Sequence, residues 1–198
     1  MTQEDDPSKF RWPKNDDQLL RWSDDQSESV TFSECGRSRQ TEIWDGYMYA
    51  GEALIDASNS KPYQRNSLIY PILFCYRHGL ELALKWIITQ YGDAAGVSAP
   101  RLDHDLWKLW ESCKAVFEYS NTDVGEDIQA VEKIIKNFHD LDKSGESFRY
   151  SANRRGDLIP LPNGPKDLGN LRGVMKGVAN FFDGWDAYLS ELASYTDC

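Results

Sequence analysis

Residues 70–88 constrain the fold of this chain most, because as a helix they are apolar around almost the whole circumference. A helix of that kind is normally buried in a protein core. Four polar residues interrupt it at spacings of one, three and four, namely Arg77, His78, Glu81 and Lys85. Residues three and four apart share a helical face, so these form one polar stripe. The stripe is either a buried ladder of ion pairs or one wall of a functional site.

Apolar residues recur at helical spacing in further segments as well. We expect helices over about 41–58, 65–91, 103–117, 123–141 and 167–194, with Asp103 and Asp123 as N-caps of the third and fourth. Pro71 should kink the second helix or mark its true start. The only strand signal is a short piece at 157–161. The sequence therefore predicts an all-α bundle of about five helices.

The N-terminal part differs in composition from the rest. The chain has 198 residues and a net charge of −10, of which residues 1–60 contribute −7. Residues 1–40 are acidic and polar, and we expect an irregular arm there, followed by one helical domain over 41–198. An acidic chain is not steered toward nucleic acid by its overall field, although a local basic patch can still bind it.

Several classes of protein are excluded by missing motifs. The four cysteines form no CxxC pair, so we expect no zinc site, and Cys75 and Cys113 lie in apolar helical patterns typical of buried thiols. No glycine-rich phosphate loop, nucleophile elbow or HExxH pair is present. The first residues do not resemble a signal peptide, and we expect no membrane-spanning run. We expect a cytoplasmic protein without cofactor, metal or membrane contact.

Three groups of polar residues could carry chemistry. The first is the stripe, in which His78 adds a titratable group to the ladder. The second is His104-Asp105, where a histidine in the first turn of a helix is favoured as the neutral imidazole. The third begins with His139-Asp140-Leu141-Asp142 at the end of the fourth helix. It continues with basic and aromatic side chains: Lys143, Phe148, Arg149, Tyr150, Arg154 and Arg155. Such a mixture suits phosphate contact and base stacking.

Each group also has a structural interpretation. Arg77, Glu81 and Lys85 are spaced for ion pairs within one helix, and His104 could simply pack the start of the third helix. The basic segment could be a solvated loop in which Arg149 pairs with Glu81 or an aspartate. That pairing would tie the long connection at 143–166 to the second helix.

Residues of all three groups, in this order, resemble a subset of HEPN-domain proteins over about 65–190. The matching residues are Tyr70-Pro71, Tyr76-Arg77-His78, Glu81, Leu84 and Lys85; His104-Asp105-Leu106, Leu109 and Trp110; and Asp142, Ser147, Phe148-Arg149-Tyr150 and Gly156. The resemblance implies a helical bundle that often dimerises. Many relatives act in phage defence or toxin–antitoxin systems, and many are metal-independent ribonucleases with an active site at the dimer interface.

The catalytic motif of those ribonucleases is absent. It consists of an arginine and a histidine separated by four to six residues, and no arginine stands at that distance before His78, His104 or His139. We therefore expect a binding or regulatory module that engages RNA or a nucleotide, as a homodimer or with a protein partner. Its ligand-binding residues would be Arg77, Glu81, Lys85, Tyr150, Arg154 and Arg155.

Two alternatives stay open. One is a nonstandard ribonuclease in which His78 or His104 is the general base and Arg149 stabilises the phosphorane charge, a role that Arg77 could fill instead. The other is a purely structural interaction domain, with a buried ladder on the second helix and the tryptophan-containing arm as the partner contact.

Overall fold

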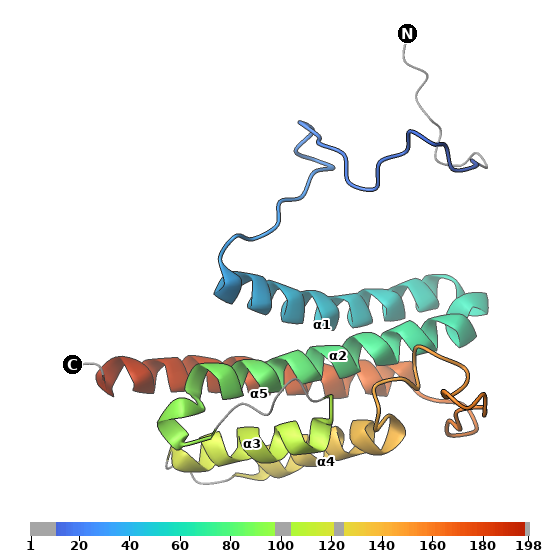
Figure 1. Ribbon diagram of the computed structural model, residues 1–198. Helices are drawn as coiled ribbons and strands as arrows, with labels where there is room; N and C mark the ends of the chain where they lie inside the picture. The colour runs from blue at the N-terminus through green and yellow to red at the C-terminus, as the bar shows by residue number, and fades with distance from the viewer. Residues whose placement is uncertain (1–10, 98–103, 121–124, 197–198) are drawn as a thin grey trace. The chain divides into compact units, whose positions relative to one another are not determined.

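The computed structural model describes residues 11–97, 104–120 and 125–196. Within these ranges the secondary structure is helical, with five α-helices and two short 3-10 helices. The prediction of an all-α bundle of about five helices is confirmed (Figure 1). The α-helices are α1 (Gly36–Ser60), α2 (Arg65–Tyr91), α3 (Leu106–Tyr119), α4 (Glu126–Leu141) and α5 (Leu168–Thr196), and the 3-10 helices are η1 (Pro62–Gln64) and η2 (Asp93–Ala95).

Helix α2 forms the centre of the bundle. It packs against α1, α3 and α5, and α3 packs in turn against α4. Figure 1 shows α2 and α5 between α1 on one side and α3 with α4 on the other. Since neighbours surround it, α2 buries side chains on most of its circumference, from Ile72 to Ile88. This placement confirms that the apolar run belongs to the core.

Two glycines allow α1 to approach α2 closely. A Cβ at Gly51 would lie 2.7 Å from the ring of Tyr76, and a Cβ at Gly79 would lie 2.8 Å from the sulfur of Met48. Both distances are shorter than real Cβ contacts. The two helices therefore meet with a glycine from each facing a large side chain from the other.

The helix starts differ from the predictions by a few residues. Helix α1 begins at Gly36 rather than near residue 41, whereas α2 begins at Arg65 as predicted. Pro71 lies inside α2, which is one of the two positions that the sequence allowed. Asp105 is the N-cap of α3, where its carboxylate accepts the backbone N–H groups of Trp107 and Lys108. Asp103 and Asp123, the predicted caps, lie outside the described residues.

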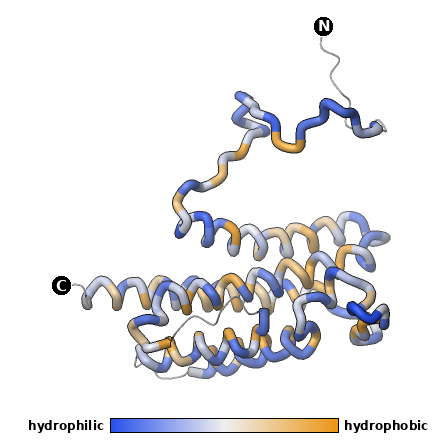
Figure 2. Tube along the Cα trace, in the orientation of Figure 1, coloured by the Kyte–Doolittle hydropathy of each residue, from blue (hydrophilic) through white to orange (hydrophobic). Residues whose placement is uncertain are grey.

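A long connection, residues 142–167, joins α4 to α5 and carries the basic cluster. Phe148 is buried, whereas the stretch around Arg154 and Arg155 is exposed and strongly hydrophilic (Figure 2). The predicted strand piece is reduced to one antiparallel bridge between Ala152 and Leu158. The connection is thus anchored to the core at one end and solvated in its middle.

The chain divides into two compact units, Met1–Ser33 and Glu34–Cys198. The described part of the first unit, residues 11–33, contains turns but no helix or strand. Cys75 and Cys113 are buried free thiols, as predicted, and Cys35 is exposed. Among the helices described, none is both long and apolar enough to cross a membrane.

Candidate functional site

The side chain of Arg77 joins three segments that are distant in sequence. It lies in the middle of α2, is only 3% exposed, and donates through all three guanidinium nitrogens. Nη1 donates to Glu81 Oε2 at 3.1 Å, and Nη2 donates to the carbonyl oxygen of His104 at 2.8 Å. Nε donates to the carbonyl oxygen of Asp142 at 3.2 Å and lies 3.2 Å from its Oδ2. The three polar groups singled out in the sequence therefore converge.

Glu81 is the shared acceptor of this network. It is 1% exposed, and its Oε1 accepts a hydrogen bond from Lys85 Nζ at 2.7 Å and lies 2.8 Å from His104 Nδ1. Burial opposes ionisation of the carboxyl, but the hydrogen bonds from Lys85 and His104 outweigh burial, so the pKa of Glu81 lies below its ordinary value. The predicted ion pairs from Glu81 to Arg77 and Lys85 are both present.

The contact between His104 and Glu81 fixes how the imidazole is protonated. An ionised carboxylate can only accept hydrogen bonds, so Nδ1 of His104 carries a proton. In the neutral ring Nε2 is then the acceptor, and the side chain is 66% exposed. His104 precedes the N-cap Asp105 and so does not lie in the first turn of α3, which corrects the sequence-based placement. The imidazole is therefore oriented by the buried Glu81 and not by the dipole of α3.

Asp142 couples Arg77 to the start of the long connection. Its Oδ1 accepts the backbone N–H groups of Glu146 at 2.9 Å and of Ser147 at 3.0 Å, which closes a tight turn. Gly145 adopts a left-handed φ of 75°, and a Cβ there would lie 3.3 Å from Arg77 Nη1. The left-handed conformation therefore favours glycine, and a larger residue would also press against the Arg77 guanidinium.

Arg149 follows this turn in the sequence and is exposed. Its Nε donates to the carbonyl oxygen of Gly145 at 2.8 Å. The guanidinium lies 5.3 Å from the ring centroid of Tyr150 and 6.0 Å from that of Phe74 on α2. The connection does reach α2, but the Glu81 carboxylate is occupied by Arg77, Lys85 and His104, and Arg149 contacts an aromatic ring of α2 instead.

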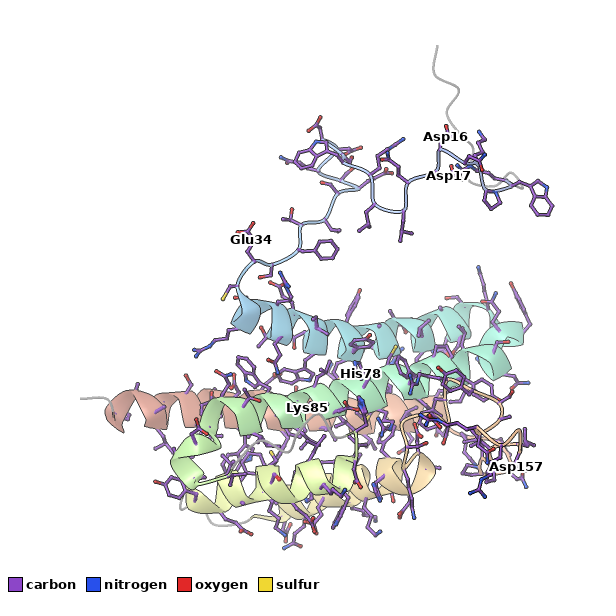
Figure 3. The ribbon with its side chains drawn as sticks, in the orientation of Figure 1. Asp16, Asp17, Glu34, His78, Lys85 and Asp157 are labelled. Atoms are coloured by element: carbon purple, nitrogen blue, oxygen red, sulfur yellow. The ribbon has the colours of Figure 1, made fainter. Side chains whose placement is uncertain are left out.

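His78 belongs to an aromatic cluster on the same helix. Its ring stacks on Phe74 with 5.7 Å between centroids and meets the edge of Tyr47 from α1 at 4.6 Å. Burial lowers the pKa of His78, and the negative charge of Glu81 only partly offsets this effect. The imidazole is therefore neutral at physiological pH. Figure 3 shows His78 and Lys85 along α2.

A cavity of about 320 Å³ opens beside Arg149. Its lining combines aromatic, basic and hydroxyl side chains with aliphatic ones: Tyr70, Ser147, Phe148, Arg149, Tyr150, Ser151, Leu158, Ile159 and Leu161. Tyr150 is 56% exposed. Three of the nine lining residues are aromatic, and Arg149 supplies a cation next to them.

The remaining predicted residues lie around this centre. Arg154 and Arg155 are exposed on the connection, and Arg154 forms an ion pair with Glu146 at 3.6 Å. His139, near the end of α4, is half-buried with Nδ1 3.2 Å from Asp105 Oδ1. These residues are not part of the Arg77 network.

Sequence reasoning missed two contributors to this arrangement. Asp142 belonged to the third polar group and to the family pattern but was given no role of its own, although it is 1% exposed and holds both Arg77 and the turn. Phe74 was not predicted as a site residue, because an aromatic residue in an apolar run cannot be distinguished from an ordinary core residue. The offset of four between Phe74 and His78 is the one local signal that could have linked it to the stripe.

Comparison with known proteins assigns the chain neither a family nor a function. The chain matches no protein-family model, and no curated protein or solved structure is significantly similar to it. Within the described ranges, no group of three or more histidine, cysteine, aspartate or glutamate side chains is arranged to hold a metal ion. The functional argument therefore rests on the geometry of the network and of the adjoining cavity.

Proposed function

We propose that this protein is a HEPN-like module that binds RNA or a nucleotide and acts as a binding or regulatory component of a phage-defence or toxin–antitoxin type of system. The observation that carries the proposal is the cavity of about 320 Å³ beside Arg149, Tyr150 and Tyr70. Aromatic faces stack on nucleobases, and a neighbouring arginine contacts phosphate or stacks on the base. Under the same proposal the protein works in the cytoplasm as a homodimer or with a protein partner.

The local charge supports an anionic ligand. Between Lys143 and Lys166 the chain carries five basic and two acidic residues, although its net charge is −10. A basic segment on an acidic protein attracts phosphate locally without steering the whole molecule to nucleic acid. The exposed side chains of Arg149, Arg154 and Arg155 belong to this segment.

The buried network has a different role in this proposal. The guanidinium of Arg77 is enclosed and engaged on every nitrogen, so it holds the connection in place rather than contacting the ligand. Lys85 and the exposed His104 ring border the network at the surface. They extend the ligand-binding face along α2.

Substituting Arg149 by glutamine and Tyr150 by alanine tests the proposal. Each change should weaken binding of a short single-stranded RNA of mixed sequence by roughly tenfold, since stacking and a phosphate contact are lost. Fluorescence anisotropy at two salt concentrations measures the affinity and its salt slope. Lys176→Gln, an exposed lysine on α5, is the matched control and should bind as the parent does.

Two results would overturn this reading. Absence of RNA binding and of mononucleotide binding by the parent protein contradicts the proposal directly. If Arg149→Gln lowers the melting temperature while the parent binds nothing, the connection serves a structural role, as in a protein-interaction domain.

A second candidate, a metal-independent ribonuclease, is favoured by the pair of His104 and Glu81. With Nδ1 protonated toward Glu81, Nε2 of a neutral His104 can accept the proton of a ribose 2′-hydroxyl. The neutral His78 is the other available base, and Arg149 would stabilise the charge that develops on the phosphate.

Cleavage of total RNA in the presence of EDTA tests this candidate. His104→Ala should lower the cleavage rate by roughly 100-fold if His104 is the general base, and His78→Ala shows whether the second imidazole fills that role. Glu81 is left intact in both variants, so the buried network keeps its carboxylate. No cleavage at any protein concentration rules the candidate out.

A further inference from the structure

A second cavity, of about 390 Å³, lies where four segments of the bundle meet. The start of α2, the end of α4, the long connection and the start of α5 all contribute to its lining. Its volume falls in the range of small-molecule sites, on the order of 300–1,000 Å³. Six half-buried aliphatic side chains line it: Ile69, Leu73, Leu141, Leu161, Leu168 and Leu171.

These aliphatic side chains distinguish the cavity from a gap in a packed core. Core residues elsewhere in the bundle, such as Leu80 and Leu109, have no exposed surface. Here six aliphatic residues from four segments keep part of their surface open around one space. Filling the space with an apolar group would remove that surface from water, which is favourable for both ligand and protein.

The charged part of the lining is predominantly cationic. Arg65 and Lys166 contribute two positive charges, and Asp167 contributes the single negative charge. Asp167 Oδ1 accepts the backbone N–H of Asn170 at 3.0 Å, so this carboxylate is turned toward its own helix. Arg65 donates through Nε to the carbonyl oxygen of Ser58, and Lys166 donates to the carbonyl oxygen of Asn163. Their remaining donors suit an anionic group.

We propose that this cavity binds a small amphipathic anion, namely a molecule with an unbranched apolar body and one carboxylate. The aliphatic walls take the body, and Arg65 with Lys166 takes the carboxylate. The cavity shares Tyr70, Phe148 and Leu161 with the cavity beside Arg149. An occupant would therefore contact the same connection that carries Arg149, although the proposal does not depend on RNA binding.

The chain-length dependence of binding tests the apolar part. Hexanoate, octanoate and decanoate are titrated into the full chain by isothermal calorimetry. The affinity should rise by roughly threefold to fourfold for each added methylene that is buried. Leu171→Trp fills the cavity and should abolish binding; Leu161→Trp, on the connection, repeats the test if the first variant is unstable. No binding by the parent, or unchanged binding by both filled variants, overturns the proposal.

The comparison of decanoate with decanol tests the anionic part. A purely apolar cavity prefers the alcohol, because burying an unpaired carboxylate is costly. We expect decanoate to bind more tightly than decanol, and the double variant Arg65→Gln/Lys166→Gln to lose about tenfold in decanoate affinity and reverse that order. Lys176→Gln should leave the affinity for both ligands unchanged. A parent protein that binds decanol at least as tightly as decanoate overturns the assignment of an anion.

Discussion

Replacing Arg77 by methionine is expected to lower the free energy of unfolding by about 3–5 kcal/mol. Methionine fills much of the same space, so packing is largely kept and the loss reports on the charge and hydrogen bonds. The carboxylate of Asp142 would then remain 1% exposed without its cation, and the carbonyl oxygen of His104 would lose its donor. Removing one partner of a buried ion pair is costly because the other charge stays buried.

Chemical denaturation of matched variants measures this effect. Lys85→Met removes the second, partly exposed cation of Glu81, and Arg154→Met removes a surface cation whose side chain is 92% exposed. We expect Arg154→Met to change the unfolding free energy by less than about 1 kcal/mol, with Lys85→Met between the two. A loss below about 1 kcal/mol for Arg77→Met would show that the network does not hold the three segments together.

The fold could be predicted where the spacing of apolar residues along a segment identifies a helix. Helix α2 could be identified because its apolar residues cover most of its circumference, and such a helix has few alternatives to a central position. The starts of α1 and α3 could not be placed as well, because helix ends depend on capping contacts of single side chains. Asp105, rather than Asp103, caps α3, and this shift moved His104 out of the helix.

The site was predictable only where its contacts are local. The offsets of four from Arg77 to Glu81 and from Glu81 to Lys85 predict ion pairs within one helix, and both are present. The bond from Arg77 to Asp142 spans 65 residues, and nothing in the pattern around Asp142 signals it. One interpretation of the sequence paired Arg149 of the long connection with Glu81 or an aspartate. In the structure, Arg77 of α2 pairs with Asp142 at the start of the connection. Either pair would tie the connection to α2, and the pair that is present is buried.

Asp142 offers the second large effect, because one side chain supports both the network and the turn. Asp142→Ala should lower the free energy of unfolding by about 3 kcal/mol, since Arg77 loses a buried counter-ion. It also leaves the backbone N–H groups of Glu146 and Ser147 without their acceptor. We therefore expect faster amide hydrogen exchange at residues 145–150 and RNA affinity lowered about as much as by Arg149→Gln, roughly tenfold.

Asp142→Asn separates these two roles. The amide oxygen of asparagine can still accept the N–H groups of Glu146 and Ser147, so the turn should keep its hydrogen-exchange protection. The charge opposite Arg77 is lost, so most of the stability loss should remain. RNA affinity should then follow the turn and stay near that of the parent protein. Asp142→Asn could instead weaken RNA binding as strongly as Asp142→Ala while the turn stays protected. In that case the charge of the network, rather than the position of Arg149, determines the RNA affinity.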